Sequence, residues 1–196
     1  MNNSNNSVRD MRDTELTLLL EESETEKDIK SHIARVEKKM DVLIRLLKDR
    51  AANHDKSKLE YPEKQGFIRM DKEPRYPYGS PEYFDKMKRY DYVLKKHYEN
   101  NSHHPEHYDG WICEMDLLDI IEMLCDWTSY REGLTPQEAI YTVEQQVKRF
   151  HISDELSSIM INTLKRYLVD YTELDRFMGF KSTDAIDVKN LTDFGM

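Results

Sequence analysis

Residues 25–48 read TEKDIKSHIARVEKKMDVLIRLLK, and the apolar side chains of this stretch decide the fold class. They recur every three or four residues, which is the spacing of one face of an α-helix. These side chains are Ile29, Ile33, Val36, Met40, Leu43 and Leu47. No proline or glycine interrupts the chain before Pro62. The pattern predicts a helix that begins near Thr25 and buries this stripe.

The same periodicity and clear capping signals predict helices farther along the chain. One is expected at 81–97 and another at about 112–129, both rich in apolar residues at helical spacing. Thr135 and Glu138 form the pattern of a capping box, and Ser153 is a typical N-cap, so each opens a further helix. We find no alternating pattern of a β-strand. The sequence therefore predicts an all-α fold.

The expected organisation is a single helical domain between polar tails. The predicted segments are an N-terminal tail with a possible short helix at 1–24, a helical domain at 25–171 and a polar C-terminal tail at 172–196. Within the domain, residues 135–171 form the C-terminal helices. Residues 61–82 contain four prolines and two glycines, which predicts a long irregular connection.

Composition limits the classes of function. The net charge of −9 disfavours an extended surface for nucleic acid. The two cysteines form no Cys-x-x-Cys pair, which excludes a zinc ribbon and is typical of a reducing compartment. No segment has the length and hydropathy of a signal peptide or a membrane span. We therefore expect a cytoplasmic protein without a membrane partner, and a homo-oligomer stays open.

Histidine is concentrated in two short stretches. NHDKSK at 53–58 and NNSHHPEH at 100–107 hold four of the seven histidines, and His97 lies just ahead of the second stretch. Imidazoles beside a carboxylate are ligands for divalent transition metals. The alternative interpretation is that these histidines belong to ordinary polar loops.

His32 and Asp126 extend the pattern. His32 lies beside the apolar stripe, where a histidine in the protein core is the common outcome. Asp126 shares one side of the helix at 112–129 with Asp116, Asp119 and Glu122. For Asp116 and Asp119 a solvated acidic face is the better interpretation, whereas Asp126 is as compatible with burial at a site as with exposure.

Taken in order, His32, His54-Asp55 and Asp126 spell His…His-Asp…Asp. This order resembles the HD-domain superfamily of metal-dependent phosphohydrolases, over about residues 32–127. The likeness is closest to a bacterial and phage branch that carries HD-x-SK and N-x-HHP motifs. The resemblance implies an all-α domain of the HD type.

The resemblance also implies a cofactor and roles for single residues. The cofactor would be one or two divalent transition metal ions, Mn, Fe, Co, Ni or Zn. Lys58 would neutralise phosphate charge, and Glu122 would orient a ligand histidine or act as a general acid or base. The implied metal ligands are His32, His54, Asp55, His97, His103, His104 and Asp126.

Helix geometry constrains two of these ligands. His32 and His54 are 22 residues apart, and an unbroken helix would separate them by about 33 Å. They share an ion only if the chain reverses between them, and otherwise His97 or His104 must take the place of His32.

Three functions are compatible with these residues. The leading hypothesis is a phosphohydrolase that acts on a nucleotide or a related phosphate ester. The second is an HD-type di-iron oxygenase, and the third is a helical binding protein without enzymatic activity. For the metal-dependent hypotheses we expect His54, Asp55 and Asp126 to converge on one ion. We expect His97, with His103 or His104 or both, to hold a second ion.

Overall fold

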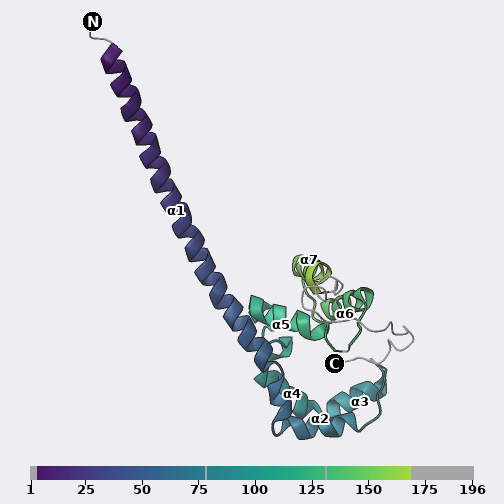
Figure 1. Ribbon diagram of the computed structural model, residues 1–196. Helices are drawn as coiled ribbons and strands as arrows, with labels where there is room; N and C mark the ends of the chain where they lie inside the picture. Colours follow the sequence, from purple (N-terminus) through teal and green to yellow (C-terminus); the bar gives the residue numbers. More distant parts are fainter. Residues whose placement is uncertain (1–3, 78, 131, 169–196) are drawn as a thin grey trace. The chain divides into compact units, whose positions relative to one another are not determined.

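The computed structural model describes residues 4–77, 79–130 and 132–168, and every regular element in these ranges is helical (Figure 1). The prediction of an all-α fold is confirmed. The predicted tail at 172–196 lies outside the described residues. None of the described helices is both long and apolar enough to span a membrane. The chain divides into two units, the first ending at Asp49 and the second beginning at Arg50.

The first described element is α1, an unbroken helix at Ser4–Asn53. The predicted start near Thr25 was therefore wrong. The helix extends through the residues before Thr25 because no proline or glycine there breaks it. The first unit contains α1 up to Asp49 and no other described element.

The apolar stripe of α1 is exposed. Ile33 and Met40 each keep 57% of their surface accessible, and only Leu47 of the six stripe residues is half-buried. Within the first unit the prediction of a buried stripe was wrong. The spacing correctly identified one apolar face, but no described element of the first unit packs against that face.

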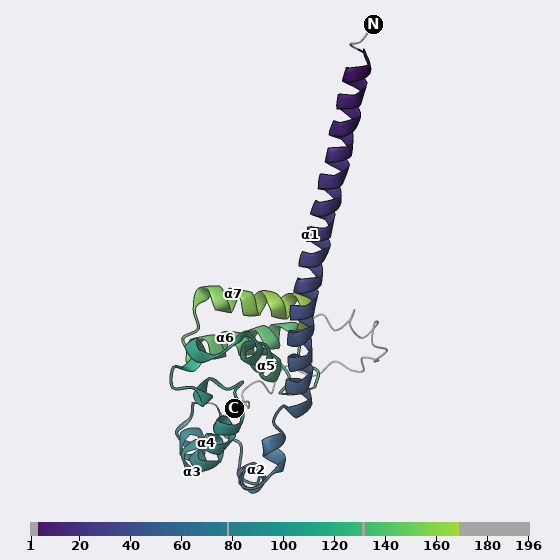
Figure 2. The same ribbon diagram turned by 90° about the vertical axis from the view of Figure 1, so that its left-hand side faces the viewer.

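The second unit contains the remaining helices. They are α2 (Glu63–Asp71), α3 (Pro81–Arg89), α4 (Asp91–Asn100), α5 (Leu117–Trp127), α6 (Pro136–Arg149) and α7 (Asp154–Thr163), with one π-helical turn at Leu164–Leu168. Short 3₁₀ turns occur at Lys56–Leu59, Pro105–His107 and Trp111–Glu114. Figures 1 and 2 show α2, α3 and α4 gathered together and α5, α6 and α7 gathered together, in agreement with the helix contacts.

Several predicted boundaries within the second unit need correction. The segment 61–82 is not wholly irregular, because it contains α2. The expected helix at 81–97 is interrupted at Tyr90, which leaves helical geometry while its hydroxyl donates to Glu73 Oε1 at 2.8 Å. The helix expected from residue 112 begins at Leu117 instead, since Asp116 caps it.

The apolar core of the second unit lies among α5, α6 and α7. The rings of Trp127 and Phe150 stack at its centre with centroids 5.8 Å apart. The predicted capping box of Thr135 and Glu138 is present, and Ser153 caps α7, as its sequence signal indicated. The buried core residues are Ile120, Met123, Leu124, Trp127, Ala139, Val143, Phe150, Ile152, Met160 and Leu164.

A glycine allows α2 to pack closely on α4. Gly66 of α2 is buried, and a Cβ at this position would lie 2.2 Å from Cγ2 of Val93, which is fully buried on α4. Glu63 lies about one turn before Gly66, and His97 about one turn after Val93. The close approach of the two helices thereby sets the separation of these two polar side chains.

We predict that Gly66→Ala destabilises the protein, although alanine ordinarily favours a helix by about 1 kcal/mol over glycine. Overpacking against Val93 should lower the free energy of unfolding by about 1–3 kcal/mol. Urea denaturation measures the change, and Gln65→Ala, at an exposed neighbour, is the matched control. Gly66→Ala combined with Val93→Ala should be less destabilising than the sum of the two single changes. A Gly66→Ala protein as stable as the unaltered chain would contradict this account of the packing.

Candidate metal centre

The centre begins where α1 ends. α1 stops at Asn53, and Asp55 then adopts a left-handed backbone with φ of 54°. Aspartate is one of the few residues that tolerate this conformation. The turn directs His54 and Asp55 towards side chains from three other parts of the second unit. These are His97 on α4, His103 and His104 in the loop that follows α4, and Asp126 on the last turn of α5.

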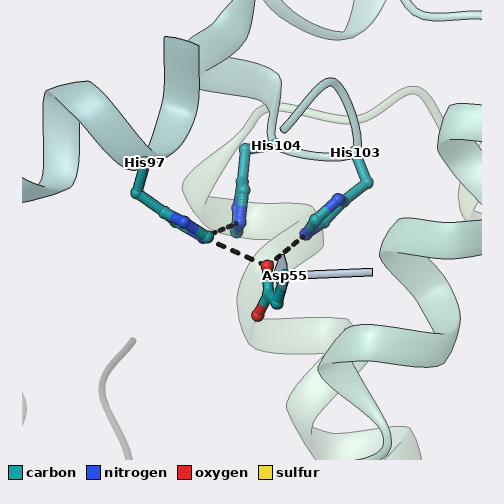
Figure 3. Close-up of side chains that lie close together, drawn as sticks. All are labelled: Asp55, His97, His103 and His104. Carbon is teal, nitrogen blue, oxygen red and sulfur yellow. Dashed lines mark hydrogen bonds and ion pairs between the residues drawn. The ribbon is translucent and has the colours of Figure 1, made fainter. Parts of the chain in front are cut away.

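Four side chains form the first cluster, which we name group A: Asp55, His97, His103 and His104. Figure 3 shows the three imidazoles pointing towards one carboxylate oxygen. Asp55 Oδ1 lies 3.3 Å from His97 Nε2 and 3.5 Å from His103 Nε2. The Nε2 atoms of His97 and His104 are 2.9 Å apart.

A second cluster, group B, consists of His54, Asp55, His103 and Asp126. His54 Nε2 lies 3.6 Å from Asp55 Oδ2 and 3.4 Å from Asp126 Oδ1. Asp55 thus offers Oδ1 to group A and Oδ2 to group B. A carboxylate in this position is suited to bridge two ions.

The spacings fit the ligand shell of a transition metal. Ligand atoms bound at about 2.0–2.2 Å to one ion, with angles of about 90–110°, lie about 2.9–3.6 Å from one another. Moreover, Asp55 Oδ1 and His103 Nε2 are buried and have no hydrogen-bond partner among the described residues. Buried polar atoms nearly always have a partner. A cation that accepts both lone pairs would satisfy them.

One carboxylate orients two of the imidazoles. Glu122 Oε1 accepts a hydrogen bond from His54 Nδ1 at 2.9 Å and lies 3.1 Å from His103 Nδ1. With hydrogen on both Nδ1 atoms, both Nε2 atoms can present a lone pair to an ion. Arg50 Nε donates to Glu122 Oε2 at 2.6 Å and fixes the carboxylate from its other side.

Glu63 orients His97 in the same way as Glu122 orients His54 and His103. Its Oε2 lies 2.9 Å from His97 Nδ1 and accepts from Ser57 Oγ at 2.8 Å, while Oε1 accepts from Asn100 at 2.6 Å. Glu63 is almost completely buried. Sequence reasoning missed it because it lies in the segment expected to be irregular, and no pattern marks a buried glutamate there.

The two sequence motifs meet in this network. Asn101 donates from Nδ2 to Ser57 Oγ at 2.8 Å. Ser57 belongs to the HD-x-SK motif and Asn101 to the N-x-HHP motif. The two stretches are therefore joined by a direct side-chain hydrogen bond as well as through their candidate ligands.

Burial keeps three imidazoles in the form that binds metal. It is the main cause of the lowered pKa of His97, His103 and His104, which are accordingly neutral at neutral pH. Asp126 is the main cause that raises the pKa of His54 to about 9, so a metal ion would have to displace a proton there. Burial opposes ionisation of Asp55, but hydrogen bonding and charge from Lys58 hold its pKa below the ordinary value.

Lys58 also lies beside the candidate ligands. Its Nζ donates to Asp55 Oδ2 at 2.7 Å and sits over the ring of Phe67, 5.2 Å from the centroid. Lys56 instead donates to Asn53 Oδ1 at 2.9 Å and is exposed. The two lysines therefore differ sharply in their relation to Asp55.

The structure does not bring His32 into either group. His32 is exposed on α1, and the helix continues through Lys39 without the reversal that a shared ion would require. The sequence argument named His97 or His104 as its replacement. Group B instead contains His103.

Asp119 also differs from expectation. It is only 2% exposed, and it accepts hydrogen bonds from Ser102 at 2.7 Å and from Tyr108 at 2.7 Å, as well as pairing with Arg50. The interpretation of Asp119 as part of a solvated acidic face was wrong, because three partners compensate its burial. Asp116, in contrast, is exposed and caps α5.

Comparison with known proteins gives one family. Residues 21–166 match the model of a family described as a family of unknown function (DUF5662). No curated protein and no solved structure matches the chain.

We predict that Glu122→Gln weakens metal binding by about 10- to 100-fold, the usual effect of removing a partner that orients a ligand. The amide nitrogen cannot accept from an imidazole Nδ1–H, so the orientation of His54 and His103 is lost in part. Calorimetric titration with Mn²⁺ measures the affinity. Glu144→Gln, at an exposed position on α6, removes the same charge and should leave the affinity unchanged. Equal affinities for all three proteins would contradict the orienting role.

Proposed function

The chain belongs to the DUF5662 family, and we propose that it is a metal-dependent phosphohydrolase that acts on a nucleotide or a related phosphate ester. The observation that carries the proposal is the position of Asp55. Its two oxygens face two groups of candidate ligands, and a lysine able to neutralise phosphate lies beside it. The order His54-Asp55…Asp126 resembles the HD-domain superfamily and supports the same reaction.

The donor set suits one or two ions of Mn, Fe, Co, Ni or Zn. Four imidazoles and two carboxylates match the preferences of these metals, whereas Ca²⁺ and Mg²⁺ prefer shells of oxygen atoms. His97 and His104 would hold one ion and His54 and Asp126 the other, with Asp55 common to both. Such ions lower the pKa of a bound water and polarise a phosphoryl oxygen.

His103 makes the two groups unequal. Its Nε2 carries a single lone pair and can complete only one of the two groups, although it lies within both. The other group would then have three protein ligands. A site with three protein ligands leaves a coordination position for water or substrate, as catalytic metal sites do.

Lys58 favours an anionic substrate. A phosphate ester carries negative charge that the metal ions would compensate only in part. A lysine supplies a further positive charge on a flexible stem. The Lys58 side chain is 32% exposed, so it is accessible from solvent while its Nζ contacts Asp55. The contact of its Nζ with the Phe67 ring helps to hold the ammonium group on the same side as the ligands.

Glu122 acts in this proposal as a positioning residue. One of its oxygens contacts two imidazoles and the other accepts from Arg50. With both oxygens engaged, orientation of the ligands is favoured over the alternative role of general acid or base.

We predict that purified protein contains Mn, Fe, Co, Ni or Zn and loses hydrolysis of phosphate esters after chelation. Elemental analysis gives the metal content, and a screen of nucleotides and p-nitrophenyl phosphate with and without chelator gives the activity. Saturation with Mn²⁺ should give two ions per chain. A ratio that stays at one would refute the version with two ions, and protein that binds no transition metal would refute the proposal.

We predict that Lys58→Ala reduces turnover of a phosphate ester by about 10- to 1000-fold, the scale of removing a group that stabilises developing charge. Metal content and thermal stability should change little. Lys56→Ala is the matched control because it removes the same charge two residues away and should have a smaller effect. If Lys58→Ala is silent while chelation abolishes activity, the di-iron oxygenase becomes the better assignment.

A further inference from the structure

The first unit exposes an apolar stripe over residues 29–47 of α1. Exposed fractions along it are 54% for Ile29, 57% for Ile33, 42% for Val36 and 50% for Leu43. Helices in proteins gain most of their stability from packing of an apolar face, and contiguous exposed apolar surface marks an interaction site. The arrangement of the side chains identifies the kind of partner.

The stripe follows a heptad repeat. Its six residues are separated alternately by four and three positions, which is the spacing of a coiled-coil seam. Ile29, Val36 and Leu43 occupy heptad position d, and Ile33, Met40 and Leu47 occupy position a. The preceding d and a positions hold Glu22 and Glu26, so the seam begins at Ile29.

The opposite face of α1 is suited to solvent. Most of the positions distant from the seam hold charged residues, namely Arg35, Lys38, Asp41, Arg45 and Lys48, and the large apolar exception is Val42. All of these are exposed. Ile44 and Leu46, which flank the seam at positions e and g, widen the apolar surface near its C-terminal end. An apolar face opposite a mostly charged one is the pattern of a helix that pairs with another helix.

We propose that residues 29–47 form a parallel coiled coil with a second copy of this chain. The residues that flank the seam at positions e and g favour a parallel pair of two identical helices. In a parallel pair, position g of one helix lies beside position e of the next heptad in the other helix. His32 would then lie beside Glu37 of the second copy, and the apolar stem of Lys39 beside its Ile44. Neither contact places like charges together.

The antiparallel arrangement is disfavoured. If the six seam residues paired in opposite directions, the centre of the pair would fall at Lys38. Glu37 would then lie against Glu37 of the second copy, and Lys39 against its Lys39. Like charges at such positions destabilise helix pairs and specify against that alignment.

Sedimentation velocity of the full chain tests the proposal. The chain mass is 23.5 kDa, and we expect twice this value. Combined Ile33→Lys and Leu43→Lys substitutions place charges in the seam and should give a monomer. Ala34→Lys, on the outer face of the same helix, should leave the assembly intact. A monomer for the unaltered chain, or an assembly that survives both seam substitutions, overturns the proposal.

Cross-linking tests the direction without requiring the seam to be disrupted. Both native cysteines are free, so the background carries Cys113→Ser and Cys125→Ser. Ile29→Cys in this background should form a disulfide-linked dimer on mild oxidation, because parallel helices place the two sulfurs in one layer. In the antiparallel pair the two positions would be about 27 Å apart. Failure of Ile29→Cys to cross-link, or equal cross-linking by the outer-face control Arg35→Cys, overturns the parallel seam.

This inference is independent of the proposed phosphohydrolase activity. The substitutions lie in the first unit, whereas all candidate ligands lie in the second. Both tryptophans, Trp111 and Trp127, lie in the second unit, so an unchanged tryptophan fluorescence spectrum of the Ile33→Lys and Leu43→Lys protein serves as a control that the second unit is folded.

Discussion

The candidate metal centre depends on the carboxylate of Glu122. One oxygen contacts the Nδ1 atoms of His54 and His103, and the other accepts from Arg50. The interactions join the end of α1, the loop after α4 and the face of α5 at one point. Without that carboxylate, two imidazoles would lack a fixed orientation and Arg50 would retain only part of its charge compensation. Coordination geometry in such a centre is set by residues that do not bind the ion.

In the second unit, one group of helices encloses the apolar core and the other contributes to the candidate metal centre. α5, α6 and α7 enclose an apolar core built around Trp127 and Phe150. Where α2 packs on α4, buried polar side chains accompany the buried Val93, and Glu63 and His97 form the centre of a hydrogen-bond network. α5 contributes to both, because Met123 and Leu124 belong to the core, Asp126 is a candidate ligand and Glu122 contacts two others.

The sequence was informative where residue type alone restricts chemistry. His54, Asp55, His97, His103, His104 and Asp126 were all expected near one another, and the structure brings them into two overlapping groups. Their proximity was expected from the resemblance of the motif order to that of the HD-domain superfamily, which also named His32. Helix caps at Asp116, Thr135 and Ser153 depend on local chemistry, and the caps at Thr135 and Ser153 were found directly from the sequence.

What could not be predicted depends on tertiary partners. Hydrogen bonds from Ser57 and Asn100 compensate the burial of Glu63. Hydrogen bonds from Ser102 and Tyr108 do the same for Asp119. No periodic pattern in the sequence encodes those pairings. His32 was placed among the ligands by motif order, but an uninterrupted α1 keeps it exposed. Apolar spacing on α1 identified a face but could not say what covers it, because intramolecular and intermolecular packing use nearly the same period.

The left-handed backbone of Asp55 determines how the role of this residue can be isolated by mutation. At φ of 54° an alanine would be strained by about 1–2 kcal/mol. Asp55→Ala would therefore disturb the turn that directs His54 and Lys58 in addition to removing two ligand atoms. Asparagine accepts this backbone conformation and nearly matches the shape of aspartate. Asp55→Asn thus removes the negative charge while it preserves the turn, and it separates the electrostatic contribution of the carboxylate from its architectural one.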